Sequence, residues 1–366
     1  MTARRRGPIP TGVEAETVHR LLAAGLLSTR TVIDGSLRVS QLSGRNLNLA
    51  VTTRDGPSYV VKYNCVGGSC REAAAYELLA AVAGPEVRAV LPSVVADTPQ
   101  DAMLVLEHVG GSDLRHHHAR IGRCPSSWAR RSGTLLAAVH DVPISAVPAT
   151  LRRGYVPAVH RPDESLFATR SRAAIELTVL IQSDPALCAA LDELAADHTA
   201  DAFVHGDIRW PNLLVARDPG GRPTGLRLVD WESAGVGDPD WDIGCLLAEY
   251  VSHWIDSVPL TSAATAAADA ALARVPLAAT QAAIAAAWSG YLARRGAERV
   301  DGSTLQRVTR HAAHRLLHRA LEIDQVSPDV SLAAVCHVQV GARMLADPDA
   351  ASTQLLGLRN AGIADG

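Results

Sequence analysis

Three short segments of this chain carry side chains that suit phosphoryl transfer. They are His205-Gly206-Asp207, Asn212 a little further on, and Val229-Asp230-Trp231-Glu232. Phosphoryl transfer needs a carboxylate that orients or deprotonates an acceptor hydroxyl, and oxygen ligands that hold Mg²⁺ on the phosphates of ATP. We therefore predict that Asp207 is the catalytic carboxylate and that Asn212 and Asp230 are the metal ligands.

The elements around these segments are predicted to bring them together. The apolar residues 202–204 lead into the His-Gly-Asp turn, and residues 212–215 are typical of a strand. A polar turn at residues 218–221 leads into a second strand at residues 226–229. In such a hairpin, the aspartate that follows the second strand returns beside the asparagine that opens the first.

These motifs resemble those of a known family. His-Gly-Asp-x-x-x-x-Asn, the later Asp-Trp-Glu, and Gly237-Asp238-Pro239-x-x-Asp242 are similar to the aminoglycoside phosphotransferase and choline kinase-like family, over residues of about 30 to 260. The resemblance implies an α+β, bilobal, protein-kinase-like fold, with a small antiparallel β lobe containing one main helix and a larger, mostly helical lobe. It also implies that Asp242 braces the catalytic loop, although Asp242 is equally suited to be the N-cap of the following helix.

Lysine usage supports the same chemistry. Lys62 is the only lysine among 35 lysine and arginine residues. It lies in the β-branched and aromatic segment 58–63, where the kinase fold keeps the lysine that binds the ATP phosphates. Residues 71–79 are rich in helix-forming Ala, Leu and Glu. We predict that Glu72 in this helix pairs with Lys62, with Glu77 as the alternative.

Two further segments are predicted to bind the nucleotide. Residues 38–51 are typical of two strands and a turn, which places Ser43 to Asn48 over the phosphates, where Ser43 and backbone N–H groups can donate hydrogen bonds. Residues 103–111 are a buried type of strand that stops at two glycines. In kinase relatives this is the hinge between the lobes, so the backbones of Glu107 and Val109 are predicted to contact adenine.

The domain organisation follows from these positions. We predict an N-terminal extension over residues 1–30, a small nucleotide-binding lobe over 31–110, and a large catalytic and acceptor-binding lobe over 111–366. The large lobe is expected to contain a helix at 127–140 and an alanine-rich helical remainder, with Pro259 and Pro276 marking breaks between helices.

Composition limits the setting and the partners. The net charge of −3 argues against a strongly basic nucleic-acid binder. Apolar runs are too short to span a membrane and the first residues lack an apolar signal core, so we expect a cytoplasmic protein without a membrane partner. The cysteines, two of which are Cys65 and Cys70, form no Cys-x-x-Cys pair and are expected to be reduced thiols.

Two groups of histidines are candidate metal sites. The run His116-His117-His118 is predicted to be a solvated surface segment. His311, His314 and His318 share a helical face with Arg307 and Arg315. Three imidazoles at this spacing can bind a metal, but the arginines repel one. This face is therefore predicted to be a basic surface for an acidic partner.

The acceptor is open to three hypotheses. Arg209-Trp210 stands where small-molecule kinases of the family often have His-Pro, and with residues 241–244 and 250–254 it resembles stand-alone kinases of class V lanthipeptide and thioamitide biosynthesis. Those kinases phosphorylate Ser or Thr of a ribosomally made precursor peptide, and a separate lyase then eliminates the phosphate. On this hypothesis the basic face of residues 307–318 docks an acidic leader peptide.

The second hypothesis is a small-molecule kinase for an antibiotic, sugar or amino alcohol. The balanced charge after Asp242 counts against a polycationic aminoglycoside, whose ammonium groups need acidic partners. The third hypothesis is a catalytically inactive nucleotide-binding scaffold. Loss of Lys62, Asp207, Asn212 or Asp230 would mark such a protein, and all four are present.

Overall fold

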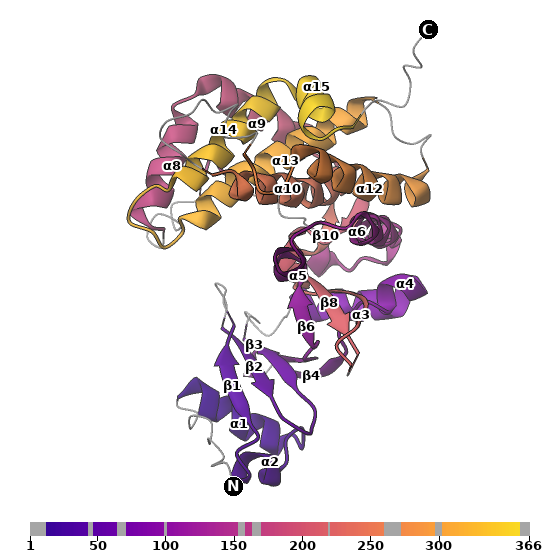
Figure 1. Cartoon of the computed structure of the whole chain (residues 1–366). Helices are drawn as coiled ribbons and strands as arrows, with labels where there is room; N and C mark the ends of the chain where they lie inside the picture. Colours follow the sequence, from indigo (N-terminus) through magenta and orange to yellow (C-terminus); the bar gives the residue numbers. More distant parts are fainter. Residues whose placement is uncertain are drawn as a thin grey trace.

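The computed structural model describes residues 12–42, 47–63, 71–98, 101–152, 158–162, 170–218, 220–259, 272–296 and 302–358. A sheet-containing lobe formed by the first part of the chain lies at one end of the molecule, and a layered helical lobe lies at the other (Figure 1). The segments that carry Asp207 and Asp230 belong to the second lobe. The predicted α+β, bilobal fold is confirmed.

The small lobe is built on a five-stranded antiparallel sheet. The strands occur in the spatial order β1 (Arg38–Gln41), β2 (Asn48–Thr52), β3 (Tyr59–Lys62), β5 (Met103–Glu107) and β4 (Val94–Thr98). Side chains alternate between the faces of a strand, and β5 shows the result. Leu104 and Leu106 pack in a cluster with α3 (Arg71–Val82), whereas Met103 and Val105 pack on the opposite face.

The opposite face of the sheet is covered by the N-terminal helix α1 (Val13–Ala23), which is followed by α2 (Thr29–Ile33). Val18, Leu21 and Leu27 share a hydrophobic cluster with Val51 and Val61 of the sheet. The described part of the predicted N-terminal extension, residues 1–30, therefore packs on the small lobe. Its apolar side chains form part of the core on this face of the sheet, a role that local sequence does not reveal.

A three-stranded sheet links the small lobe to the site. β6 (Gly111–Asp113) pairs with β8 (Leu213–Arg217), and β8 pairs with β9 (Pro223–Leu228). Leu213 lies opposite Leu228, and the Val229 N–H donates to the Asn212 carbonyl at 3.0 Å. The predicted hairpin is therefore present. A second pairing, between β7 (Ala202–Val204) and β10 (Gly235–Gly237), holds the strand before the His-Gly-Asp turn.

The helical lobe is layered around α10, which is buried along most of its length. Close approach of the helices depends on glycines. A Cβ on Gly133 would lie 1.9 Å from the Ala287 carbonyl oxygen, and one on Gly290 would lie 2.2 Å from that of Arg130. The helices of this lobe are α5 (Leu114–Ile121), α6 (Ser126–His140), α8 (Arg172–Gln182), α9 (Pro185–Ala196), α10 (Pro239–Ser257), α12 (Leu277–Arg295), α13 (Gly302–Ile323), α14 (Leu332–Ala346) and α15 (Pro348–Ala350).

Several smaller predictions have an outcome in these elements. The helix predicted at 127–140 is α6. Pro259 follows the end of α10, and Pro276 is the N-cap of α12, so both prolines lie between helices as predicted. Cys124, Cys188, Cys245 and Cys336 are free thiols. Cys65, Cys70 and most of the alanine-rich stretch after Pro259 lie outside the described residues.

Within the described residues, no single helix has both the length and the apolar composition needed to cross a membrane. The helices α8 and α9 meet that criterion only when taken together, and they are bent by 91° relative to each other.

Candidate active site

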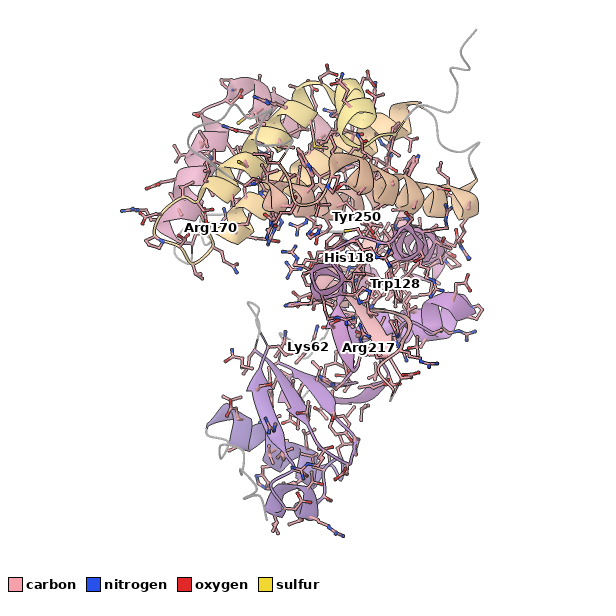
Figure 2. All side chains as sticks on the ribbon, in the orientation of Figure 1. Lys62, His118, Trp128, Arg170, Arg217 and Tyr250 are labelled. Carbon is pink, nitrogen blue, oxygen red and sulfur yellow. The ribbon has the colours of Figure 1, made fainter. Side chains whose placement is uncertain are left out.

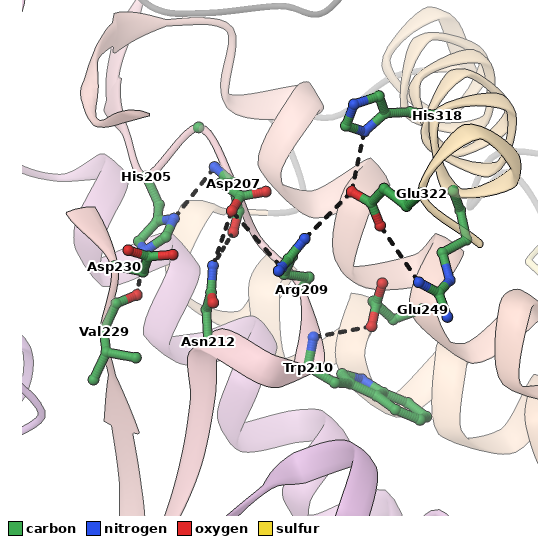
Figure 3. A network of polar contacts seen from close by, with 12 residues as sticks. His205, Asp207, Arg209, Trp210, Asn212, Val229, Asp230, Glu249, His318 and Glu322 are labelled. Carbon is green, nitrogen blue, oxygen red and sulfur yellow. Dashed lines mark hydrogen bonds and ion pairs between the residues drawn. The ribbon is translucent and has the colours of Figure 1, made fainter. Parts of the chain in front are cut away.

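The catalytic loop begins with a turn that only glycine fits. Gly206 has φ +81°, and a Cβ there would lie 2.5 Å from the Ser233 carbonyl oxygen. This conformation turns the chain so that Asp207 follows the end of β7. The Asn212 Nδ2 donates to the Asp207 carbonyl at 2.9 Å and to its Oδ2 at 3.1 Å (Figure 3). Asp207 and Asn212 therefore lie together, as predicted.

His205 ties this loop to the strand that leads to Asp230. Its Nε2 donates to the Val229 carbonyl at 3.0 Å, and its Nδ1 accepts from the Asp207 N–H at 3.3 Å (Figure 3). One nitrogen donates and the other accepts, which is the arrangement of a neutral imidazole. The His205 ring thereby fixes the position of the Asp207 backbone relative to that of Val229, the residue before Asp230.

Asp242 braces the same loop from α10. Its Oδ2 accepts from the His205 N–H at 2.7 Å, and its Oδ1 accepts from the Gly206 N–H at 2.9 Å. His140 contacts the same carboxylate at 3.2 Å, and both side chains are fully buried. The predicted brace is confirmed. The alternative N-cap interpretation is wrong, because α10 starts earlier, at Pro239, and its cap is Asp238.

Lys62 lies at the centre of an ion-paired group. Its Nζ is 2.8 Å from both carboxylate oxygens of Glu72 and 2.6 Å from Oδ1 of Asp230. Burial alone would lower the pKa of Lys62, but the two carboxylates raise it above its ordinary value. The predicted pairing with Glu72 is present. Glu77, the alternative, is exposed on the far face of α3.

Asp230 sits in a strained backbone position. Its φ is +72°, in the left-handed region that non-glycine residues seldom adopt. Although burial opposes ionisation, the charge of Lys62 and its hydrogen bond keep the pKa of Asp230 below its ordinary value. Strain of this kind concentrates at functional sites, and the carboxylate is charged and available to a cation.

The oxygen atoms near Asp230 are suited to a hard divalent cation. Carboxylate oxygens of Glu72, Asp230 and Glu232 all lie within 4.8 Å of one another. Asn212 uses its amide nitrogen to bond Asp207, so its oxygen is the atom that can act as a ligand. Mg²⁺ prefers such oxygen donors. Glu232 was not predicted as a ligand from sequence, although it belongs to the same Asp-Trp-Glu motif.

The residues predicted to bind the nucleotide have varied outcomes. Asn48 lies directly opposite Lys62 in the β2–β3 pairing. Ser43 lies outside the described residues. The Glu107 N–H donates to the Ser93 carbonyl at 2.9 Å, so this N–H is not free for the predicted adenine contact. Val109 follows in the segment between β5 and β6.

Both histidine predictions are wrong. His117 and His118 are 4% and 0% exposed, and His118 packs edge-on against Trp210 at 4.5 Å between centroids. Figure 2 shows His118 on α5, close to Tyr250 on α10. Only His116 of the three is exposed. Three consecutive polar residues are typical of a solvated segment. Here they belong to an eight-residue helix at the junction of the lobes, and one face of that helix is buried.

The predicted basic surface on α13 is also buried. His311, His314 and Arg315 are 1%, 5% and 3% exposed, and Arg307 is paired with Asp240. This face packs on α10, whose first turn carries carboxylates that neutralise it. Most of the polar stripe therefore marks a helix interface with paired charges, and only the side chains of Arg307 and His318, at 31% and 20%, stay partly exposed. A face that is mostly buried does not support docking of a leader peptide.

The fold is kinase-like, with a lysine–glutamate pair in the small lobe and a braced His-Gly-Asp loop in the large lobe. This combination defines a class of phosphoryl-transfer proteins. The chain belongs to the phosphotransferase enzyme family, whose sequence model matches residues 38–277. This match confirms the resemblance seen in the motifs.

Individual relatives are more distant. The chain is 29% identical over 183 residues to viomycin phosphotransferase of Streptomyces vinaceus, a match that spans 48% of this chain and 61% of that protein. Less than two thirds of that relative's length is therefore matched. Choline kinase from Cryptosporidium parvum shares the fold, with a TM-score of 0.52 and 13% identity over 94% of this chain and 99% of that one. A macrolide 2'-phosphotransferase from Brachybacterium faecium has a TM-score of 0.46 and 18% identity, over 91% and 99% of the two chains.

Proposed function

We propose that this protein moves the γ-phosphoryl group of Mg·ATP to an acceptor hydroxyl. The observation that carries this proposal is the contact of Lys62 with both Glu72 and Asp230. A chain that otherwise uses arginine in place of lysine has an ammonium at this one position. That ammonium is held by two carboxylates, beside the loop that presents Asp207 and Asn212.

Each of these residues has a role in direct in-line transfer. Lys62, held by Glu72, positions the phosphates, and Asn48 lies beside it on the next strand. Asp230 and Asn212 would hold Mg²⁺, which would neutralise the charge of the phosphates. Asp207 orients the acceptor hydroxyl and takes its proton. Ser43 and the backbones of Glu107 and Val109 complete the nucleotide contacts on this proposal.

The acceptor we place first is Ser or Thr of a ribosomally synthesised precursor peptide, with a separate lyase eliminating the phosphate. Arg209-Trp210 and the segments 241–244 and 250–254 support this proposal. The burial of the α13 face removes the leader-docking argument that accompanied it. A small-molecule acceptor is the second candidate, because relatives are named for viomycin and choline.

Transfer of labelled γ-phosphate from Mg·ATP tests the proposal. We expect labelled product from at least one member of a panel of Ser/Thr-rich precursor peptides, amino alcohols, sugars and antibiotics, and slow hydrolysis of ATP without an acceptor. A protein that binds Mg·ATP but neither hydrolyses it nor labels any hydroxyl would be the inactive scaffold of the third hypothesis.

A further inference from the structure

Arg209 lies beside the carboxylate at which the acceptor hydroxyl must arrive. Its Nε is 3.8 Å from Oδ2 of Asp207, and its Nη1 is 3.3 Å from Oε1 of Glu322 on α13. Figure 3 shows it between these two carboxylates. Its side chain is 32% exposed, so the guanidinium can contact a ligand while keeping both partners.

Arg209 is one of four arginines that share few carboxylates, which we call the arginine group: Arg115, Arg209, Arg315 and Arg319. Glu322 contacts three of them, Arg315 at 3.0 Å, Arg209 at 3.3 Å and Arg319 at 3.5 Å. Glu249 contacts Arg115 at 3.2 Å and Arg315 at 3.6 Å. Within ion-pair distance, the four guanidinium groups meet three carboxylates, those of Glu322, Glu249 and Asp207.

The ionisation of Arg319 reflects this excess. Burial and the nearby charge of Arg115 lower the pKa of Arg319, although Glu322, Glu249 and Asp256 act in the opposite direction. Arg315 is 3% exposed, so it pairs with Glu249 and Glu322 but is not accessible to a ligand. Arg115 and Arg319 keep 31% and 20% of their side chains exposed. Arg115, Arg209 and Arg319 come from different segments of the chain. Their side chains are partly exposed to solvent, and each shares its carboxylate partner with another arginine.

Glu249 connects the arginine group to the catalytic loop. Its Oε2 accepts from the Trp210 N–H at 3.0 Å, and its side chain is almost fully buried. The loop that presents Asp207 is thus attached to this network at two consecutive residues, Arg209 and Trp210. The excess positive charge is consequently fixed next to the site of transfer rather than free to move away.

We propose that the acceptor carries an anionic group, a carboxylate or a phosphate, close to the hydroxyl that is phosphorylated, and that Arg209, with Arg115 and Arg319, binds this group. Guanidinium groups bind carboxylates and phosphates through paired, charge-assisted hydrogen bonds. They repel ammonium groups at the same place. The proposal rests on the phosphotransferase function proposed above. The anionic group belongs either to an acidic residue beside Ser or Thr in a peptide or to a small hydroxylated acid.

The experiment measures kcat and KM for matched acceptors, together with ATP hydrolysis in the absence of any acceptor. Serine peptides flanked by Glu, Gln or Lys form one arm, and glycerate, glucose 6-phosphate, glucose and ethanolamine form the other. The variants are Arg209→Gln, Arg209→Lys and, as a control on the same helix as Glu322, Arg310→Gln. Arg310 pairs with the exposed side chains of Glu193 on α9 and of Asp197, which caps the end of α9, and loss of such an ion pair has a small effect.

We expect wild-type protein to use anionic acceptors in at least one arm with kcat/KM about tenfold or more above their neutral and cationic counterparts, as expected for one charge-assisted hydrogen bond. Arg209→Gln should raise KM for those acceptors by a similar factor and raise KM for their neutral counterparts by a smaller one. Arg209→Lys should recover part of the loss, and Arg310→Gln should behave as wild type.

Preference of the wild type for neutral or cationic acceptors would overturn the inference, as would an Arg209→Gln variant that loses activity equally on all acceptors. Wild-type protein that neither hydrolyses ATP nor labels any acceptor would overturn the proposed function itself, and this inference with it. The arm that shows the anion preference identifies the source of the anionic group.

Discussion

The Nζ of Lys62 and the Oδ1 of Asp230 are 2.6 Å apart, although Lys62 ends β3 of the small lobe and Asp230 follows β9 of the other lobe. This ion pair joins the two lobes directly. Because Glu72 holds the same ammonium from α3, the lysine is placed by both lobes at once. Its position therefore depends on how the lobes meet.

Replacement of Lys62 by arginine should reduce phosphoryl transfer at least about a hundredfold, although the charge is kept. A planar guanidinium is larger than an ammonium and cannot place one compact charge between two carboxylates. The measurement is the initial rate of γ-phosphate transfer at saturating Mg·ATP. The exposed Arg38 on β1 supplies the control, Arg38→Lys, which should keep the wild-type rate. A Lys62→Arg variant with full activity would mean that the lone lysine has no special role.

The variant Asp207→Asn should lose transfer by about 10²- to 10⁴-fold, because an amide cannot take the proton of the hydroxyl. Mg·ATP binding, measured by calorimetry, should remain near wild type, since the nucleotide contacts proposed above do not involve this side chain. Asp55→Asn, at an exposed turn of the small lobe, is the control. Retained turnover in Asp207→Asn would require another residue as the base.

Replacement of Gly290 by alanine should destabilise the helical lobe by several kcal/mol, because the new Cβ would lie 2.2 Å from a backbone oxygen of α6. Gly225→Ala, on β9, meets nothing within 4 Å and should change stability by less than about 0.5 kcal/mol. Urea denaturation followed by circular dichroism measures both. Equal stabilities for the two variants would show that α6 and α12 can move apart at little cost.

His118 should make the protein less stable in mild acid. Burial, with the charges of His253 and His117, lowers the pKa of His118 to about 3. The unfolded chain takes up a proton there below about pH 6.5, whereas the folded protein does not until about pH 3. The free energy of unfolding therefore decreases as the pH falls through this window.

The variant His118→Leu removes this proton linkage and keeps an apolar contact with Trp210, so its unfolding free energy should fall less between pH 7 and pH 4 than that of the wild type. Urea titrations at several pH values measure the difference. His116→Gln, which changes an exposed imidazole on the same helix, should leave the wild-type slope unchanged. Parallel pH profiles for wild type and His118→Leu would show that His118 is protonated in the folded protein.

Sequence identifies the parts of the site that lie in short motifs. Asp207 with Asn212, and the helix carrying Glu72 after the strand carrying Lys62, are close in the chain, and their elements follow from local composition. The contact of Arg209 with Glu322 joins residues that are far apart in sequence, and nothing near either residue signals it. The only local signal is the Arg-Trp pair at positions 209 and 210 after the His-Gly-Asp motif.

The failures have a common physical cause. The polar faces of α5 and α13 carry the pattern of solvated helices, because periodicity records which residues share a face but not what that face contacts. For α13 the contact is α10, where Asp240 pairs with Arg307. For α5 it is the ring of Trp210. Such burial depends on the packing of elements that are distant in sequence. The charge pairs between them can be identified only from the three-dimensional structure.

Because Lys62 is the only lysine, proteolysis at this residue can measure how often the small lobe opens. A protease that cuts after lysine has one cleavage site here, and in the folded protein that residue is 6% exposed and lies in the middle of a five-stranded sheet. Cleavage under native conditions therefore counts excursions in which the small lobe separates from its neighbour or unfolds. A single cut, read on a gel, records the same event that breaks the contact with Asp230.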